Sequence, residues 1–488
     1  MKKIVIINIL LVMAAFSQWS CESLLEVSPP SELSETIVQT PNGIKALLYS
    51  SYRGVQNSTP SRFLINNSEV CTDIGYNTGG GENLTFSQLI NFTWDASLGT
   101  FQADVWAPYY RAIRDANLVL EYLPGTTGIS EPERAQYTAE AKLLRGYSYE
   151  YLYKWFGPVP LRTTSTSPTD LARATNEEML AQIESDLVAA APNLPNPGQE
   201  EAYGRATKGT AYGMLAKFYL NTKQWQKAVD AATSLINLNY YELFADYTKL
   251  FTVANEGNKE MIWVIPCLNI VDYGNWYQAG AMPPNFKTSS QIPEFIWQPG
   301  MSNFATQYRL RSAFVNSYDL VNDIRARLII RTYTNTSNVE VNLMATADNA
   351  RSLKYWDNAT VGNHSGNDVP EIRYADILLT KAEALNELNG PSQEALDLIN
   401  KVRSRAGLAD LTLAEATSKE VLRDLILRER GWEFVAEGKR REDLLRHNKF
   451  ISSAIARGIT IAADKHKLFP IPQTERDANK LCGQNPGY

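Results

Sequence analysis

The stretch VLRDLILRERGWEFVAEGKRREDLLRHNKF, residues 421–450, decides the fold, because its apolar and its charged residues both recur at helical spacing. The apolar positions lie three, four or seven residues apart, which predicts one helix face packed against a core. These positions are Leu422, Leu425, Ile426, Trp432, Val435 and Ala436. We expect this helix to break at Gly438.

The acidic residues of this stretch fall four apart on another side of the helix, at Glu429, Glu433 and Glu437. We expect Glu437 to pair with Arg441, the favourable i,i+4 orientation, which contributes about 0.2–0.5 kcal/mol on an exposed surface. A catalytic or metal site is the alternative, but His447 is the single histidine nearby. A helix with a salt-bridged flank is therefore the favoured interpretation.

Two helices carry a likeness to a known family. In the first stretch the residues that carry it are Arg430, Glu433, Phe434, Glu437-Gly438, Arg440, Asp443-Leu444 and Arg446. The second is AEAKLLRGYSYEYLYKWFGPVPL, residues 139–161, and the tail from Leu468 to Tyr488 adds to it. In this order the chain resembles the SusD/RagB-like outer-membrane nutrient-binding lipoproteins. Lys439, Arg441 and Glu442 depart from the family pattern.

The resemblance implies a lipid-anchored protein of the outer membrane, facing the exterior. It also implies that the protein binds a nutrient and delivers it to a SusC-like TonB-dependent transporter. The residues independently indicate export: residues 1–20 combine Lys2-Lys3 with an apolar run too short for a comfortable membrane span. Cys21 directly follows and is the predicted lipidation site, with ordinary signal cleavage nearby as the alternative.

Composition narrows the function further. A net charge of −6 gives no basic footprint for nucleic acid. Beyond Cys21 only three cysteines remain, so at most one disulfide can form within the chain. No GxSxG, HExxH, Walker or GxGxxG motif is present. We therefore expect no catalytic residue, metal or cofactor, although a glycoside hydrolase needs only two well-placed carboxylates.

Helical periodicity predicts the scaffold. Helices are expected over 40–55, 105–123 and 132–156, and helix pairs that resemble tetratricopeptide repeats over 205–241 and 374–408. Small alanines let such antiparallel helices pack closely. Stacking the two pairs requires the chain between them to loop out.

The predicted fold is mostly α, a tetratricopeptide-like helical scaffold with a large, irregular, loop-rich ligand-binding insertion. The predicted order along the chain is 1–20 signal peptide, 21–39 lipid-anchored tether, 40–240 N-terminal helical region, 241–369 loop-rich ligand-binding region and 370–488 C-terminal helical region.

Two irregular regions carry the predicted binding site, Glu69–Trp94 and Tyr273–Trp297. Both hold aromatic and amide side chains in turn-rich surroundings, where function concentrates. We expect them to meet on one face, with Trp276, Tyr277 and Trp297 stacking on the ligand. Tyr76 and Asn77 would border it, and Asp73 or Asn275 would form hydrogen bonds with it. For each ring, packing in a local loop core is the alternative.

Glycan is the favoured ligand, because flat aromatic faces complement the apolar faces of sugar rings. A peptide ligand in the same kind of uptake system is the alternative. A rival from another class is a helical scaffold whose repeats bind a protein partner. The repeat helices, including Arg205–Leu235 and Tyr374–Val402, are the expected docking face for the transporter.

Overall fold

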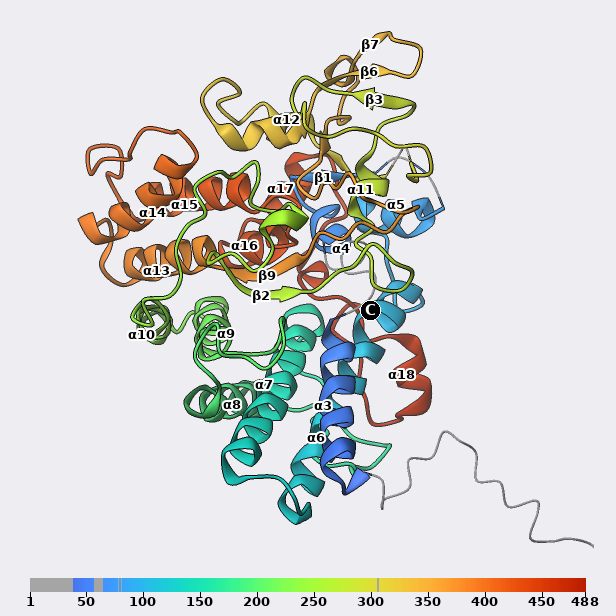
Figure 1. The fold of residues 1–488 in the computed structure, drawn as a ribbon, viewed down its shortest axis with the longest axis vertical. Helices are drawn as coiled ribbons and strands as arrows, with labels where there is room; N and C mark the ends of the chain where they lie inside the picture. Colours follow the sequence, from blue (N-terminus) through green and yellow to red (C-terminus); the bar gives the residue numbers. More distant parts are fainter. Residues whose placement is uncertain (1–37, 57–64, 78, 80, 305–306) are drawn as a thin grey trace, which may run out of the picture.

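The computed structural model describes residues 38–56, 65–77, 79, 81–304 and 307–488. Antiparallel helices form its N-terminal layer, drawn in blue to green in Figure 1: α3 (Pro41–Val55), α6 (Ala107–Tyr122), α7 (Glu131–Phe156) and α8 (Asn176–Ala190). The side chain of Thr40 caps α3 by accepting the backbone N–H of Gly43 at 3.0 Å, which satisfies a donor that the helix leaves unpaired. The first three helices lie where helical periodicity predicts them.

Short elements connect these helices. The segment between α3 and α6 holds α4 (Asn66–Glu69), β1 (Gly75–Tyr76) and α5 (Asn83–Asn91), followed by a π-helical turn over Phe101–Trp106. These pieces lie at the end of the helical layer nearest the insertion (Figure 1). They therefore join the scaffold to the loop-rich part of the chain.

The two predicted helix pairs are present and stacked. The first pair is α9 (Lys208–Asn221) and α10 (Trp225–Ile236), and the second is α13 (Tyr374–Asn389) and α14 (Gln393–Arg405). Helix α10 packs directly against α13. The chain between the pairs leaves and returns through an antiparallel ladder of β2 (Met261–Ile265) with β9 (Val369–Arg373). The expectation that this chain loops out from the scaffold is confirmed.

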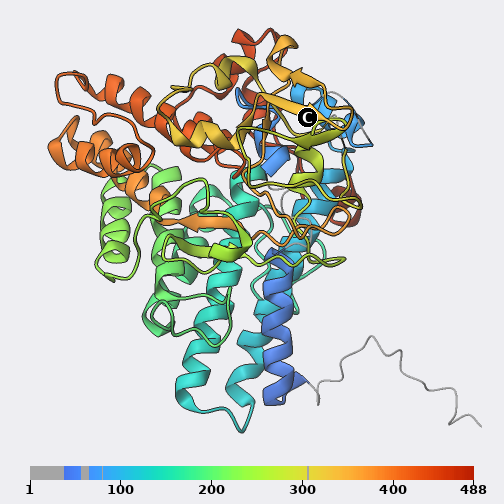
Figure 2. The ribbon, with the colours of Figure 1, turned by 45° about the horizontal axis from the view of Figure 1, so that its top comes forward.

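The insertion consists of loops held together by very short strands. Its helices are α11 (Tyr277–Ala281) and α12 (Ser312–Val315). Its strands are β3 (Phe286–Thr288), β4 (Arg309–Leu310), β5 (Ile329–Ile330), β6 (Thr332–Asn335), β7 (Glu340–Asn342) and β8 (Arg351–Ser352). Figure 2 shows the insertion at the end of the molecule opposite the start of α3.

The stretch 421–450 forms α15 (Lys419–Glu433) and α16 (Arg440–Arg446), and α17 (Phe450–Ala456) and α18 (Gln473–Ala478) follow it. Helix α15 ends at Glu433, and the connection contains Ala436 at φ 63° and Gly438 at φ 72°. Val435 and Ala436 are buried, as predicted, but lie beyond the helix. No helix in the described ranges is long and apolar enough to cross a membrane.

The predicted pair of Glu437 with Arg441 does not form, because the chain turns between them. Glu437 instead accepts hydrogen bonds from Arg373 at 2.8 Å and Lys354 at 2.7 Å. The Arg441 guanidinium lies 4.3 Å from the centroid of the Phe469 ring and donates to backbone carbonyls of residues 154 and 467. Both charges are thus buried in the body of the protein.

Candidate ligand-binding site

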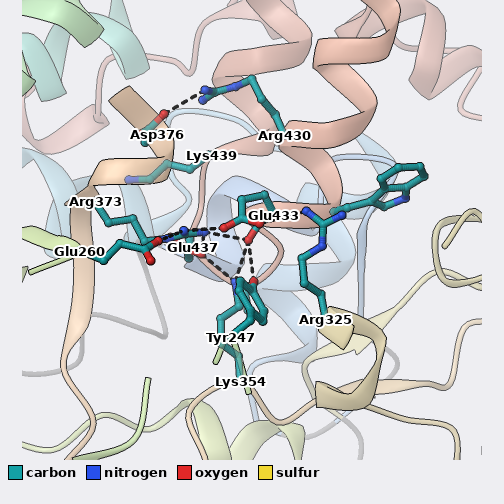
Figure 3. A network of polar contacts seen from close by, with 12 residues as sticks. Tyr247, Glu260, Arg325, Lys354, Arg373, Asp376, Arg430, Glu433, Glu437 and Lys439 are labelled. Atoms are coloured by element: carbon teal, nitrogen blue, oxygen red, sulfur yellow. Dashed lines mark hydrogen bonds and ion pairs between the residues drawn. The ribbon is translucent and has the colours of Figure 1, made fainter. Parts of the chain in front are cut away.

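The carboxylates of the C-terminal stretch are buried within a network of basic side chains (Figure 3). Glu433 is fully buried and accepts hydrogen bonds from Arg373 at 2.6 Å and Arg325 at 2.9 Å, and from Arg405. Burial alone would raise the pKa of Glu433, but these three guanidinium charges bring it well below its ordinary value. Glu433 is therefore an ionised structural group.

The neighbouring carboxylates are balanced in the same way. Glu429 binds Arg325 at 2.7 Å and Arg403 at 2.9 Å, while Glu437 binds Arg373 and Lys354. In the part of the chain that the structure describes, no three or more His, Cys, Asp or Glu groups gather as a metal ligand set. The ladder is thus ion-paired, as favoured from the sequence, but it is buried between segments rather than exposed on a helix flank.

The structure places two of the predicted stacking rings at the surface of the insertion. The indoles of Trp276 and Trp297 are both partly exposed. The Trp276 N–H donates to His364 Nδ1 at 3.1 Å. The backbone N–H of Ile296, next to Trp297, donates to Asn358 Oδ1 at 2.9 Å. One loop, residues 357–367, therefore contacts the Trp276 ring and the backbone beside Trp297.

The local sequence explains why that loop reaches Trp276. Backbone hydrogen bonds of 2.9 and 3.0 Å join Asn275 to Ser365 in an antiparallel bridge. A Cβ at Gly274 would lie 2.3 Å from the Cβ of His364, so only glycine allows the two loops to approach this closely. Trp276 is thereby held by backbone contacts on one side and by His364 on the other.

Two other predicted ligand contacts, Tyr277 and Asn275, have internal partners instead. Tyr277 is 2% exposed and packs between the rings of Tyr308 and Tyr355, at centroid distances of 5.3 and 5.4 Å. Asn275 is fully buried, accepting from the Tyr277 N–H and donating to the carbonyl oxygen of Asn367. Neither side chain presents a surface to a ligand, because the pairing that positions Trp276 encloses both.

Asp73 points toward the C-terminal helices. Both of its carboxylate oxygens accept from the Arg440 guanidinium, at 2.8 and 2.7 Å. It lines a cavity of about 610 Å³ whose walls include Phe314 and Trp432 but no residue of the range 273–297. Asp73 is therefore an ion-paired group separate from the two tryptophans.

The two irregular regions do come together in space, around Tyr308. Its ring meets Phe86 edge-on at 6.3 Å and Tyr277 at 5.3 Å. Strand β1 also pairs with β4, which holds Tyr76 opposite Arg309. Tyr76 is partly exposed, whereas Asn77 is 4% exposed. The candidate ligand contacts that keep an exposed surface are therefore Trp276, Trp297 and Tyr76.

Sequence reasoning did not single out Arg309 or Arg351, which lie in the same row as Tyr76. The alternating arginines of the segment YRLR, residues 308–311, were the available signal for a strand with a basic face. Their partner strands contain two residues each, too few for a recognisable period.

The fold is a helical scaffold with a loop-rich insertion, and known protein families match this chain. The family model described as "Starch-binding associating with outer membrane" matches residues 23–220, and the model of the SusD family matches residues 330–488. The two matches together span most of the chain, which belongs to the SusD-like family.

Similarity to individual proteins extends over nearly the whole chain. The SusD-like protein P25 of Formosa agariphila is 27% identical over 474 residues, covering 90% of this chain and 89% of the relative. The starch-binding protein SusD of Bacteroides thetaiotaomicron is 22% identical, covering 83% and 82%. Among solved structures, a laminarin binding SusD-like protein superposes with a TM-score of 0.78 at 24% identity, covering 92% of this chain and 100% of that one. The mostly helical scaffold is thus the one found in SusD-like structures.

Proposed function

We propose that this protein captures a glycan at the outer surface of the outer membrane, without catalysis, and delivers it to a SusC-like TonB-dependent transporter. The observation that carries the proposal is the pair of partly exposed tryptophans, Trp276 and Trp297, whose segments are both hydrogen-bonded to one loop. A ring that is fixed like that of Trp276 loses little conformational freedom when it stacks on a sugar. Family membership supports glycan as the ligand. So do the names of two relatives, a starch-binding protein and a laminarin binding protein.

A binding screen tests the ligand. Purified mature protein is titrated with neutral and acidic oligosaccharides and with peptides. Binding of at least one glycan is expected. Binding of peptides alone would identify the peptide-binding alternative, and binding of neither would favour a protein-interaction scaffold.

The anchor is the second part of the proposal. Cys21, which lies outside the described residues, would become the lipidated N-terminus of the mature protein, followed by the tether over residues 21–39. Stable anchoring needs more than one acyl chain, since each buried CH₂ contributes about 0.8 kcal/mol. Fatty-acid labelling should disappear in Cys21→Ala. Labelling that survives, or a wild-type protein found only in soluble fractions, rejects this anchor.

The transporter is the third part. Helices α9, α10, α13 and α14 offer a continuous surface of stacked helices, and large stable interfaces need such breadth. The candidate docking face for the transporter comprises Arg205–Leu235 and Tyr374–Val402. Co-purification from detergent-solubilised membranes should recover a large barrel protein. A solitary lipoprotein in several mild detergents would argue against the partnership.

A further inference from the structure

Three short strands place two arginines and a tyrosine in one row. Strand β1 sets Tyr76 directly opposite Arg309 of β4. The antiparallel bridge between Leu310 and Ala350 continues this register and places Arg309 beside Arg351 of β8. Directly opposed residues of antiparallel strands project from the same face, with their Cβ atoms about 4.5–5.5 Å apart. Tyr76, Arg309 and Arg351 therefore share one face of the sheet.

The charge of Arg309 is not balanced. Within the described residues its guanidinium makes no hydrogen bond or ion pair, and its buried Nε lacks an acceptor. Its neighbour across the strands is another cation, and like charges in directly opposed positions are destabilising. The fold thus retains an unfavourable contact in a chain whose net charge is −6.

Arg351 lies behind this charge and is 1% exposed. Its guanidinium donates to neutral oxygens, the carbonyls of Gln307 at 2.9 Å and Asn349 at 3.1 Å and the amide oxygen of Asn349 at 3.0 Å. Burial, and then the charge of Arg309, lowers the pKa of Arg351 to about 9. The neutral acceptors of Arg351 and its lowered pKa both indicate a positive electrostatic potential around Arg309.

The tyrosine of the row faces a third guanidinium. Arg311 lies two residues beyond Arg309, on the same face, and its guanidinium carbon is 5.1 Å from the centroid of the Tyr76 ring. Asp348 lies 3.6 Å from Arg311 and offsets that charge. Within the described residues, an aromatic ring and the unpaired guanidinium of Arg309 thus occur together on one face.

We propose that Arg309, with Arg351 behind it, binds an anionic substituent of a glycan whose ring packs on Tyr76. The substituent is a carboxylate or a sulfate ester, since the planar guanidinium fork matches the oxygens of both. This inference rests on the proposed function and narrows it to an acidic glycan. Arg309 is the contact residue, whereas Arg351 acts on the ligand through its charge.

Calorimetric titration of the mature protein tests the subsite with three hexasaccharides: a neutral β-glucan, a hexagalacturonate and a sulfated galactan. The variants are Arg309→Gln, which removes the charge, and Arg309→Lys, which keeps it without the fork. Arg327→Gln, an exposed arginine of the same insertion, is the matched control.

The wild type should bind at least one acidic hexasaccharide more tightly than the neutral one, and added salt should weaken that binding. Arg309→Gln should lose about tenfold or more of this affinity, as expected for a charge-assisted hydrogen bond. Arg327→Gln should match the wild type. The acidic probe that responds identifies the substituent as carboxylate or sulfate.

Two results would overturn the subsite and leave glycan capture intact. One is a wild type that binds the neutral hexasaccharide in preference to both acidic ones. The other is an Arg309→Gln protein that binds the acidic probes as the wild type does. A folded wild type that binds no glycan in the wider screen would overturn both proposals. Melting curves of both Arg309 variants, which should show no loss of stability, separate these outcomes from misfolding.

Discussion

The arginines beneath α15 and those of the β1, β4 and β8 row have different surroundings. Beneath α15, Arg373 contacts three carboxylates, those of Glu260, Glu433 and Glu437. In the β1, β4 and β8 row, Arg309 instead faces Arg351. A balanced buried network has no capacity left for a ligand, and removing one of its members leaves a charge stranded. An unbalanced cation near the surface retains that capacity, and within the described structure Arg309 is such a cation.

The largest expected effect is in the balanced network. Glu433→Gln removes the negative charge shared by Arg325, Arg373 and Arg405. An uncompensated buried charge costs about 3–5 kcal/mol, so the free energy of unfolding should fall by that amount in denaturant titrations. Glu340→Gln, at an exposed position of β7, is the control and should stay within about 0.5 kcal/mol of the wild type. An equally stable Glu433→Gln protein would contradict the assignment of a structural role.

Glu69 sharpens the comparison, because this buried carboxyl faces backbone N–H groups rather than arginines. It accepts from Ala436 at 3.2 Å and Gly438 at 3.0 Å. Burial raises its pKa from 4.5 to about 7. The folded state therefore holds the proton more tightly than the unfolded chain does. This group's contribution to stability is present below pH 4.5 and is lost as the pH rises toward 7, by about 3 kcal/mol in total.

Glu69→Gln should remove this loss, and denaturant titrations from pH 4.5 to 8 measure it. Another buried carboxyl, that of Glu442, has the opposite effect on stability, and it does so at acid pH. Burial would raise the pKa of Glu442, but the charge of Lys217 and other lysines outweighs it and lowers the pKa to about 2. The stability from Glu442 is therefore lost as the pH falls from 4.5 toward 2. A Glu69→Gln profile parallel to that of the wild type above pH 4.5 would contradict the account of Glu69.

Trp276 and Tyr277 extend the comparison to uncharged residues, because the Trp276 side chain is partly exposed whereas that of the adjacent Tyr277 is buried. Trp276→Ala should weaken glycan binding by about 2 kcal/mol, the scale of an interface hot spot, while the melting temperature stays nearly unchanged. Calorimetry and melting curves on the same protein measure both. Normal binding would remove Trp276 from the site, and loss of binding through unfolding would assign the ring to the core. Trp276→Phe, which keeps an aromatic face, is the conservative variant.

The same pair of residues shows how far the sequence could predict the site. Helical periods predicted α3, α6 and α7 and the stacked repeat pairs, because those patterns are local. The surroundings of Glu433 were not predictable, since its partners Arg325, Arg373 and Arg405 come from three distant segments. The sequence also could not separate Trp276 from Tyr277, because burial in a loop depends on which other loops cover it. The Arg309 row depends on the register of strands only two residues long.

The smallest expected effect is at Arg309, and it tests the central claim most directly. Relief of the repulsion with Arg351 contributes roughly 0.2–1 kcal/mol, so Arg309→Gln should melt at the same temperature as the wild type or slightly above it. The measurement compares melting curves of the two proteins with and without the acidic hexasaccharides. We predict that, at the same ligand concentration, the acidic hexasaccharide raises the melting temperature of the wild type more than that of Arg309→Gln. A variant that melts lower than the wild type yet gains the same increase from ligand would contradict the claim that an unbalanced charge marks the binding site.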